Sequence, residues 1–330
     1  MCLYPTILKN RKYTVTKKNG GNVPIMKDKR TKYVPVGCGK CMECRNQKAS
    51  SWRVRLMEDL RVNKNAKFVT FTFSDEHLEE LDKEQFDDLK GYERDNEILS
   101  LAVRRFTERW RKQFGKTVRH WLVSEIGGKY TERIHLHGLL WTDENLDVIQ
   151  DRWMYGNVKL GNGVEHYVNE QTINYIVKYV NKTDEKHPGY ISKMYVSKGI
   201  GANYFERNDI QRNRYSDGET IETYKTRKGT ELNLPIYYRN KIYSEEQREK
   251  LWIEKLDKEE RYVDGVRVDV SKGMEEYYAL LEEKRAKNKR LGYGDNERDW
   301  SLEKYEERRR ELKRAERKAR LKYNTESMPI

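Results

Sequence analysis

The sequence predicts an α+β protein in which strands and amphipathic helices follow one another along the chain. Three runs rich in β-branched and aromatic residues are typical of strands, at 67–74, 120–126 and 133–141. A short polar segment that begins with Gly127 and Gly128 separates the last two runs, which favours an antiparallel hairpin. Apolar residues spaced three to four apart predict helices before and after these strands.

Length and charge limit the classes of function. The chain has 330 residues, enough for a core of roughly 150–200 residues and smaller elements. Its formal charge of +13 favours a polyanionic partner, nucleic acid first and an anionic membrane second. No run of about 18 apolar residues predicts a membrane span. Basic residues from Lys9 onward argue against a signal peptide, so we expect an intracellular protein in which disulfides are rare.

Apolar periodicity places the expected helices along the chain. They cover 47–62, 97–114, 144–154 and 172–182, and short strands are expected at 158–160 and 166–168. The helix at 97–114 also carries a basic face, made of Arg104, Arg105, Arg109, Arg111 and Lys112. Such a face either is solvated or contacts phosphates, and the pattern does not separate the two.

All four cysteines lie in the first 44 residues, at Cys2, Cys38, Cys41 and Cys44. The two-residue gaps among the last three allow their sulfurs to converge on one ion through a tight turn. In a reducing compartment this pattern favours a structural tetrahedral zinc site in which Cys2 ties down the N-terminus. Reduced thiols without metal are one alternative. An iron–sulfur cluster is another, although no further Cys-Pro follows.

His135 and His137 lie within the strand expected at 133–141. Successive side chains of a strand point to opposite faces, so both imidazoles project from one face about 7 Å apart. In a hairpin with the preceding strand, Glu125 could lie beside them. Two imidazoles and a carboxylate form an open three-ligand site suited to Mg²⁺ or Mn²⁺. The alternative is a pair of ordinary histidines on a half-exposed strand.

Two tyrosines and two lysines share the helix expected at 172–182. Tyr175 and Tyr179 are four residues apart, so their rings lie on one face of the helix. Lys178 and Lys182 form a second pair with the same spacing on an adjoining strip. Packing tyrosines and a solvated edge of lysines are the alternative interpretation.

The order of these motifs is more specific than any one of them. A glutamate on a strand, His-x-His on the next strand and Tyr-x-x-Lys-Tyr-x-x-Lys on a later helix resemble the HUH endonucleases that start rolling-circle replication. The chain is most similar to the replication initiators of microviruses, of the gokushovirus type. Segments that support this narrower resemblance are Met1–Pro5, Val36–Cys41, Cys44–Arg45, Trp52–Arg53, Ser197–Tyr204 and Leu234–Tyr238. The resemblance covers about residues 1–243.

The resemblance implies a fold and a reaction. The fold is a central antiparallel sheet of about five strands with helices packed on one face, in a ferredoxin-like plan. In the reaction, Tyr175 or Tyr179 attacks a phosphodiester of single-stranded origin DNA, leaving a 5′-phosphotyrosine and a free 3′-OH. The motif histidines and Glu125 hold the metal. Lys178 stabilises phosphate charge or the phenolate, with Lys182 ranked below it.

Four segments are expected: a Cys-rich element and helix at 1–62, an endonuclease core at 63–200, a loop-rich extension at 201–243 and charged helices at 244–330. In the extension, Tyr204, Tyr215 and Tyr224 stand among basic residues, which suits single-stranded DNA or plain surface loops. The charged helices, at 244–259, 271–288 and 301–322, are either solvated or a DNA-tracking arm.

The expected partners follow from the same resemblance. Single-stranded viral DNA at the origin is the substrate, in the cytoplasm of a bacterial host. A host polymerase extends the 3′-OH, and a separate helicase unwinds the duplex because the sequence has no Walker-type phosphate loop. A non-cleaving DNA-binding protein and a transposase or mobilisation nickase are the rival classes. The sequence does not predict an oligomeric state.

Overall fold

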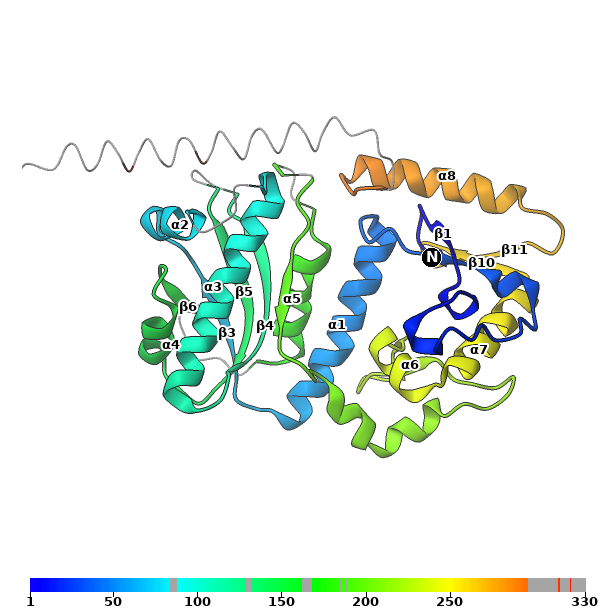
Figure 1. Cartoon of the computed structure of the whole chain (residues 1–330), viewed down its shortest axis with the longest axis horizontal. Coiled ribbons are helices and arrows are strands. Elements are labelled where there is room, and N and C mark those ends of the chain that lie inside the picture. Colours follow the sequence, from blue (N-terminus) through cyan, green and yellow to red (C-terminus); the bar gives the residue numbers. More distant parts are fainter. Residues whose placement is uncertain are drawn as a thin grey trace, which may run out of the picture. The chain divides into compact units, whose positions relative to one another are not determined.

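The computed structural model describes residues 1–83, 88–128, 132–161, 168–183, 186–187, 189–295, 314 and 321. The chain divides into two compact units (Figure 1). The first, called the sheet unit, comprises Arg55–Asn203 and Asp299–Ile330, and the second, called the cysteine unit, comprises Met1–Val54 and Tyr204–Arg298, in each case over the described residues. Among these residues no helix is both long and apolar enough to span a membrane.

A five-stranded sheet organises the sheet unit. Its order is β6-β3-β5-β4-β7 and every neighbouring pair is antiparallel. The strands are β3 (Ala66–Phe71), β4 (Arg119–Ile126), β5 (Ile134–Trp141), β6 (Val158–Leu160) and β7 (Met194–Val196). The expected antiparallel sheet and the β4–β5 hairpin are therefore confirmed.

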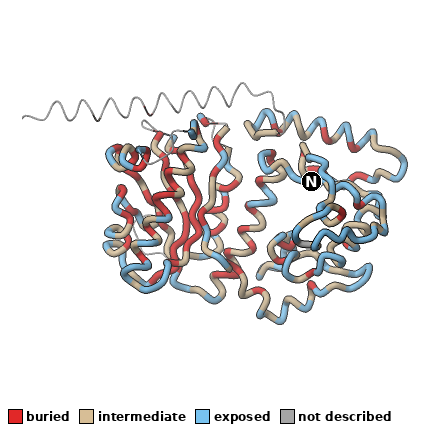
Figure 2. Tube along the Cα trace, viewed as in Figure 1, coloured by how far each residue is buried: buried red, intermediate tan, exposed pale blue. Residues whose placement is uncertain are grey.

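Helices cover both faces of this sheet. On one face, α3 (Gly91–Phe114) and α4 (Leu146–Trp153) share a buried core with β3, β4 and β5. On the other, α5 (Glu170–Asn181) packs against β4 and buries Ile173, Ile176 and Val177. Trp121 and Val123, whose side chains point to this second face, are fully buried, as are most of the strand residues drawn in Figure 2. Helices on one face only were expected, and that detail is wrong because both faces of the strands are apolar.

The segment before α3 is more ordered than expected from its acidic composition. It contains α2 (Asp75–Asp82), which begins after Ser74, whose hydroxyl accepts a hydrogen bond from the His77 N–H. Leu78 and Leu81 of this helix are buried. A serine cap followed by two acids was the local signal for this helix. The strand expected at 166–168 and the helix expected at 301–322 lie outside the described residues, apart from Val168, Arg314 and Leu321.

The basic face of α3 does not serve one purpose. Arg109 donates hydrogen bonds to the carbonyl oxygens of Arg152 and Trp153, at 2.8 and 2.9 Å. These carbonyls belong to the last turn of α4, where helical partners are missing. Arg109 therefore braces α4 against α3, whereas Arg104 and Arg111 are exposed.

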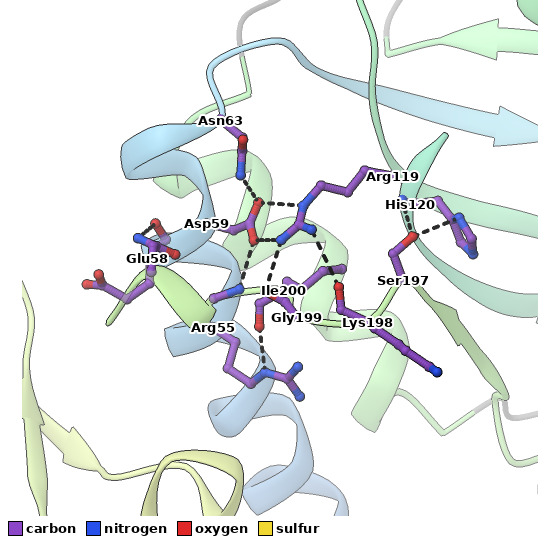
Figure 3. A network of polar contacts seen from close by, with 12 residues as sticks. Arg55, Glu58, Asp59, Asn63, Arg119, His120, Ser197, Lys198, Gly199 and Ile200 are labelled. Carbon is purple, nitrogen blue, oxygen red and sulfur yellow. Dashed lines mark hydrogen bonds and ion pairs between the residues drawn. The ribbon is translucent and has the colours of Figure 1, made fainter. Parts of the chain in front are cut away.

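A buried carboxylate ties the loop after β7 to the rest of the sheet unit (Figure 3). Asp59 lies on α1 (Met42–Val62) and is fully buried. Its oxygens accept hydrogen bonds from the Arg119 guanidinium and, at 2.8 Å, from the Gly201 N–H. Arg119 in turn donates to the Gly199 carbonyl at 3.1 Å. Residues 197–201, part of a motif that carries the family resemblance, thus have a structural role in this unit.

Gly138 marks a close approach within the sheet. A Cβ at this position would lie 2.1 Å from the Trp121 carbonyl oxygen and 2.7 Å from the Leu122 Cα, and neither backbone atom can move away. We expect Gly138→Ala to lower the free energy of unfolding by about 3 kcal/mol, measured by urea denaturation. Gly128→Ala is the matched control, because a Cβ there meets nothing within 4 Å. Equal stability of the two variants would contradict this account of Gly138.

Short elements and two cores build the cysteine unit. Its strands form three two-stranded ribbons: β1 (Thr6–Lys9) with β2 (Tyr33–Val36), β8 (Thr223–Lys225) with β9 (Glu231–Asn233), and β10 (Glu260–Val263) with β11 (Val266–Asp269). Its later helices are α6 (Ile236–Ile242), α7 (Glu245–Asp257) and α8 (Glu275–Arg290). The β10–β11 hairpin interrupts the charge-dense stretch that was expected to be helical. Its Asp264-Gly265 turn, with both φ values positive, is a hairpin signal present in the sequence.

The tyrosines of the loop-rich extension form a core. Tyr204 and Tyr224 are each 2% exposed and pack with Tyr238 and Leu234. Rings this deeply buried cannot stack on the bases of a single strand, which requires an open face. For these two residues both expectations, DNA contact and surface loops, are wrong. The signal that was missed is the density of large aromatic residues, which supplies the apolar area that a core needs.

Candidate active site

The β4–β5 hairpin brings Glu125, His135 and His137 together on the face of the sheet that α5 covers. The register pairs Glu125 directly with His135, and His137 is one pair further along the same face. The Glu125 Oε2 lies 3.1 Å from the His135 Nε2 and 2.9 Å from the His137 Nε2. Three candidate ligand atoms therefore lie within 4.8 Å of one another.

The far nitrogen of each imidazole has a partner of its own. The His137 Nδ1 lies 2.9 Å from the Thr70 hydroxyl, and the His135 Nδ1 lies 3.3 Å from the Arg133 carbonyl oxygen. Arg133 is held in place by two hydrogen bonds of 2.8 Å to Asp75. When each Nδ1 carries the proton and donates it to these oxygens, each Nε2 has a free lone pair that faces the centre of the site.

The electrostatics favour the protonation states that bind a cation. Burial by itself would raise the pKa of Glu125, but hydrogen bonds from His135, His137 and Lys182 outweigh it and hold the pKa well below its usual range. Burial lowers the pKa of His137, although the neighbouring Glu125 partly offsets this. An ionised carboxylate beside a neutral imidazole is the state in which both groups can donate electron pairs to a divalent ion. The donor set fits such an ion and leaves coordination positions open for substrate.

Tyr175 and Tyr179 project from α5 toward this site. The Tyr179 ring stacks on the His137 imidazole with centroids 4.5 Å apart, and the Tyr175 ring meets Phe68 edge-on at 6.0 Å. The two hydroxyl oxygens are 2.8 Å apart and share a hydrogen bond. Tyr175 is 50% exposed, whereas burial and the bond from Tyr175 raise the pKa of Tyr179 above its usual value. A phosphodiester that reaches this face would meet both hydroxyls at once.

The two lysines of α5 occupy different positions. Lys182 is one turn beyond Tyr179 on the same helical face, and its Nζ lies 2.8 Å from the Glu125 Oε1. The same ammonium lies 5.9 Å from the centre of the Tyr179 ring. Lys178 is exposed, and within the described part of the chain its side chain makes no hydrogen bond or ion pair with these groups. The structure therefore places Lys182 at the site, although the sequence ranked Lys178 first.

The orienting groups were not predicted. Thr70 reaches His137 because β3 pairs with β5 in a register that sets these two residues opposite each other. Nothing in the local sequence around Thr70 or Arg133 indicates such a role. The only available signal was the alternation of β3, which places the Thr70 side chain on the same face as the histidines once the strand order is known.

A second group of ligands lies in the cysteine unit. The Sγ atoms of the four cysteines lie within 4.8 Å of one another, and those of Cys2 and Cys41 are 3.9 Å apart. A tetrahedral zinc with bonds near 2.3 Å requires sulfurs about 3.8 Å apart. Backbone N–H groups of Tyr4 and Cys38 point at the Cys2 sulfur, which stabilises a thiolate. The geometry therefore fits the expected four-thiolate metal site, and it leaves the identity of the metal to analysis.

The hydroxyl of Thr70 should set the affinity of the Glu125–His135–His137 site for metal. Thr70→Val keeps the shape of the side chain but removes the partner of the His137 Nδ1, so the imidazole loses its preferred orientation. We expect Mn²⁺ affinity to fall roughly 10- to 100-fold, measured by titration calorimetry. Thr117→Val, at an exposed position, is the control. Unchanged affinity in the Thr70 variant would show that the hydrogen bond does not orient the ligand.

Comparisons with known proteins place the chain in a class. Residues 66–184, which contain both the metal ligands and the two tyrosines, match the family model of the replication-associated protein ORF2. Two curated proteins match over a longer span. The replication-associated protein VP4 of Bdellovibrio phage phiMH2K is 24% identical over 243 residues, which cover 66% of this chain and 70% of the relative. The replication-associated protein ORF2 of Spiroplasma virus 4 is 28% identical over 236 residues, 65% of this chain and 69% of the relative.

Both viruses are microviruses. The resemblance to the replication initiators of microviruses, which the sequence motifs predicted, is confirmed by these matches. No solved structure matches the chain.

Proposed function

We propose that this protein initiates rolling-circle replication of a small phage genome by nicking single-stranded origin DNA through a tyrosine. One observation carries the proposal: two tyrosine hydroxyls, hydrogen-bonded to each other, lie beside a Glu-His-His group on one face of the sheet. The similarity to phage replication-associated proteins supports the same role.

The reaction exchanges one phosphodiester for another. The attacking tyrosine oxygen forms a bond to phosphorus as its proton leaves, the bond from phosphorus to the 3′ oxygen breaks, and that oxygen takes a proton to become the 3′-OH. A tyrosine with a pKa near 10 is a weak nucleophile at neutral pH. A divalent ion bound by Glu125, His135 and His137 would supply the positive charge that makes the scissile phosphate electrophilic.

The protein's own side chains supply the rest. The hydrogen bond between Tyr175 and Tyr179 lets the second hydroxyl stabilise the oxygen of the first as it loses its proton. The ammonium of Lys182 places positive charge above the Tyr179 ring and beside Glu125. Lys178 remains a candidate for contact with the flanking phosphate, since its exposed side chain follows the same helix.

Two tyrosines allow a second transesterification. While one tyrosine holds the 5′ end of the displaced strand, the other attacks the regenerated origin. The 3′-OH released by this second cut then attacks the first phosphotyrosine and closes the strand into a circle. Each step conserves one phosphodiester-type bond, so joining needs no nucleotide cofactor. A host polymerase and a host helicase would act with the protein inside the host cell.

A covalent adduct tests this proposal. The full-length protein is incubated with a single-stranded oligonucleotide that carries the origin region and with Mn²⁺, and the products are resolved by denaturing electrophoresis. We expect a protein band shifted by the mass of the DNA fragment that is bound through its 5′ phosphate, and no such band in the presence of EDTA. Binding of the oligonucleotide without any adduct would instead identify a DNA-binding replication protein that does not cleave.

A further inference from the structure

The positive charge of the chain is concentrated near its N-terminus. Residues 1–40 contain ten Lys and Arg against one Asp, so this segment carries +9 of the chain's formal +13. None of the residues placed in the tyrosine and metal site belongs to it. The remaining 290 residues are therefore close to balanced in charge by comparison.

Most of these charges are exposed and unpaired. Exposed basic residues that make no ion pair within the described structure are Lys9, Arg11, Lys17, Lys27, Lys29, Lys32 and Lys40. Two others are neutralised inside the cysteine unit, where Lys12 pairs with Glu249 and Arg30 pairs with Asp28 and Asp257. The charge that faces solvent is thus larger than internal pairing requires.

An exposed β-ribbon lies at the centre of this charge. In the β1–β2 pairing, Ile7 is opposite Pro35 and Lys9 is opposite Tyr33, so these four side chains share one face. Ile7 is 61% and Tyr33 51% exposed, and Lys9 is exposed as well. A two-stranded ribbon with an uncovered face of this kind is not stabilised by a core of its own.

The ribbon is nevertheless held firmly at both ends. Cys2 precedes β1 and Cys38 follows β2, and the Cys38 N–H donates to the Cys2 sulfur at 3.2 Å. At the other end, the Asn10 N–H donates to the Lys32 carbonyl at 2.9 Å. The cysteine cluster therefore fixes a ribbon whose side chains are free to meet a partner, without a loss of order on binding.

We propose that the β1–β2 ribbon, with its flanking lysines, is a binding surface for double-stranded DNA. The exposed ammonium groups fit phosphates, and a two-stranded ribbon has the width that the major groove admits. A single-strand platform would need several open rings in a row, whereas on this ribbon Tyr33 is the exposed ring and Tyr13 is buried. The choice of DNA as the polyanion rests on the proposed replication role, but the surface does not depend on the tyrosine chemistry.

The test replaces charges on the ribbon of the full-length protein. Lys9→Ala/Lys29→Ala/Lys32→Ala removes three exposed, unpaired charges. Binding to a fluorescent duplex is measured by anisotropy over a range of salt concentrations. Each lost phosphate contact should lower the slope of log K against log salt by about 0.9, so we expect a decrease of roughly 2.7 and at least ~10-fold weaker binding.

Two controls separate this surface from general charge loss. Lys225→Ala/Lys228→Ala/Lys241→Ala removes three exposed lysines elsewhere in the cysteine unit and should leave duplex binding within about threefold of the wild type. The ribbon variant should also keep its covalent adduct with single-stranded DNA, so a failure of the nicking proposal would be visible separately. Unchanged duplex binding, or equal losses for duplex and single strands, would overturn the assignment of this ribbon to duplex DNA.

Discussion

Tyr175→Phe/Tyr179→Phe is expected to abolish the covalent protein–DNA adduct, by at least about 10³-fold, because it removes both candidate nucleophiles. The phenylalanine rings can keep the contacts that the tyrosines make, namely the stacking of residue 179 on His137 and the edge-on contact of residue 175 with Phe68. The fold and the metal ligands should therefore remain. The adduct is measured by denaturing electrophoresis with a labelled single-stranded oligonucleotide and Mn²⁺.

Single substitutions should separate cutting from joining. Either Tyr175→Phe or Tyr179→Phe leaves one hydroxyl beside the Glu125–His135–His137 group, so an adduct should still form, but circles should not accumulate from a substrate with two origins. Tyr262→Phe, at an exposed position outside the sheet unit, is the control and should behave as the wild type. An adduct that survives the double substitution would falsify the assignment of the nucleophiles.

Cys41→Ser is expected to remove the metal from the four-cysteine site and to destabilise the cysteine unit by several kcal/mol. The Cys41 side chain is fully buried and packs with Leu3, Met42 and Tyr277, so the ion and this core depend on the same residue. Elemental analysis of the reduced wild-type protein should find about one zinc per chain. Thermal unfolding, followed by circular dichroism, should show a lower midpoint for the variant.

A chelator provides the matched control for this site, because it removes the metal without changing the core. Wild-type protein stripped of metal should lose stability as the variant does and should regain it when Zn²⁺ is added. Iron together with inorganic sulfide would identify a cluster instead. Full stability of a metal-free protein would show that the thiols need no ion.

Much of the candidate site could be read from local pattern. The alternation of β5 places His135 and His137 on one face, and the helical repeat places Tyr175 and Tyr179 on another. The short turn between β4 and β5 predicted the hairpin that sets Glu125 opposite His135, as the register shows. These features depend on neighbours in sequence, where a period of 2.0 or 3.6 residues is enough to assign a direction to each side chain.

Other features required contacts between distant segments. Lys182 bonds to Glu125 across 57 positions, and Thr70 to His137 across 67, so neither pairing has a local signature. The same limit hid the second helical layer and the burial of Tyr204 and Tyr224. Polarity along the chain does not say which segment will cover a given face, because burial is decided by the apolar area that other elements bring to it.

The chain by itself therefore determined which side chains carry the chemistry: two imidazoles on a strand, two phenols on a helix and four thiols near the N-terminus. The tertiary structure alone decided that the helix lies over the strand face, that Lys182 rather than Lys178 reaches the carboxylate, and that the charged N-terminal ribbon stays uncovered. Side-chain direction follows from the local backbone, whereas proximity between segments arises only when the whole chain packs.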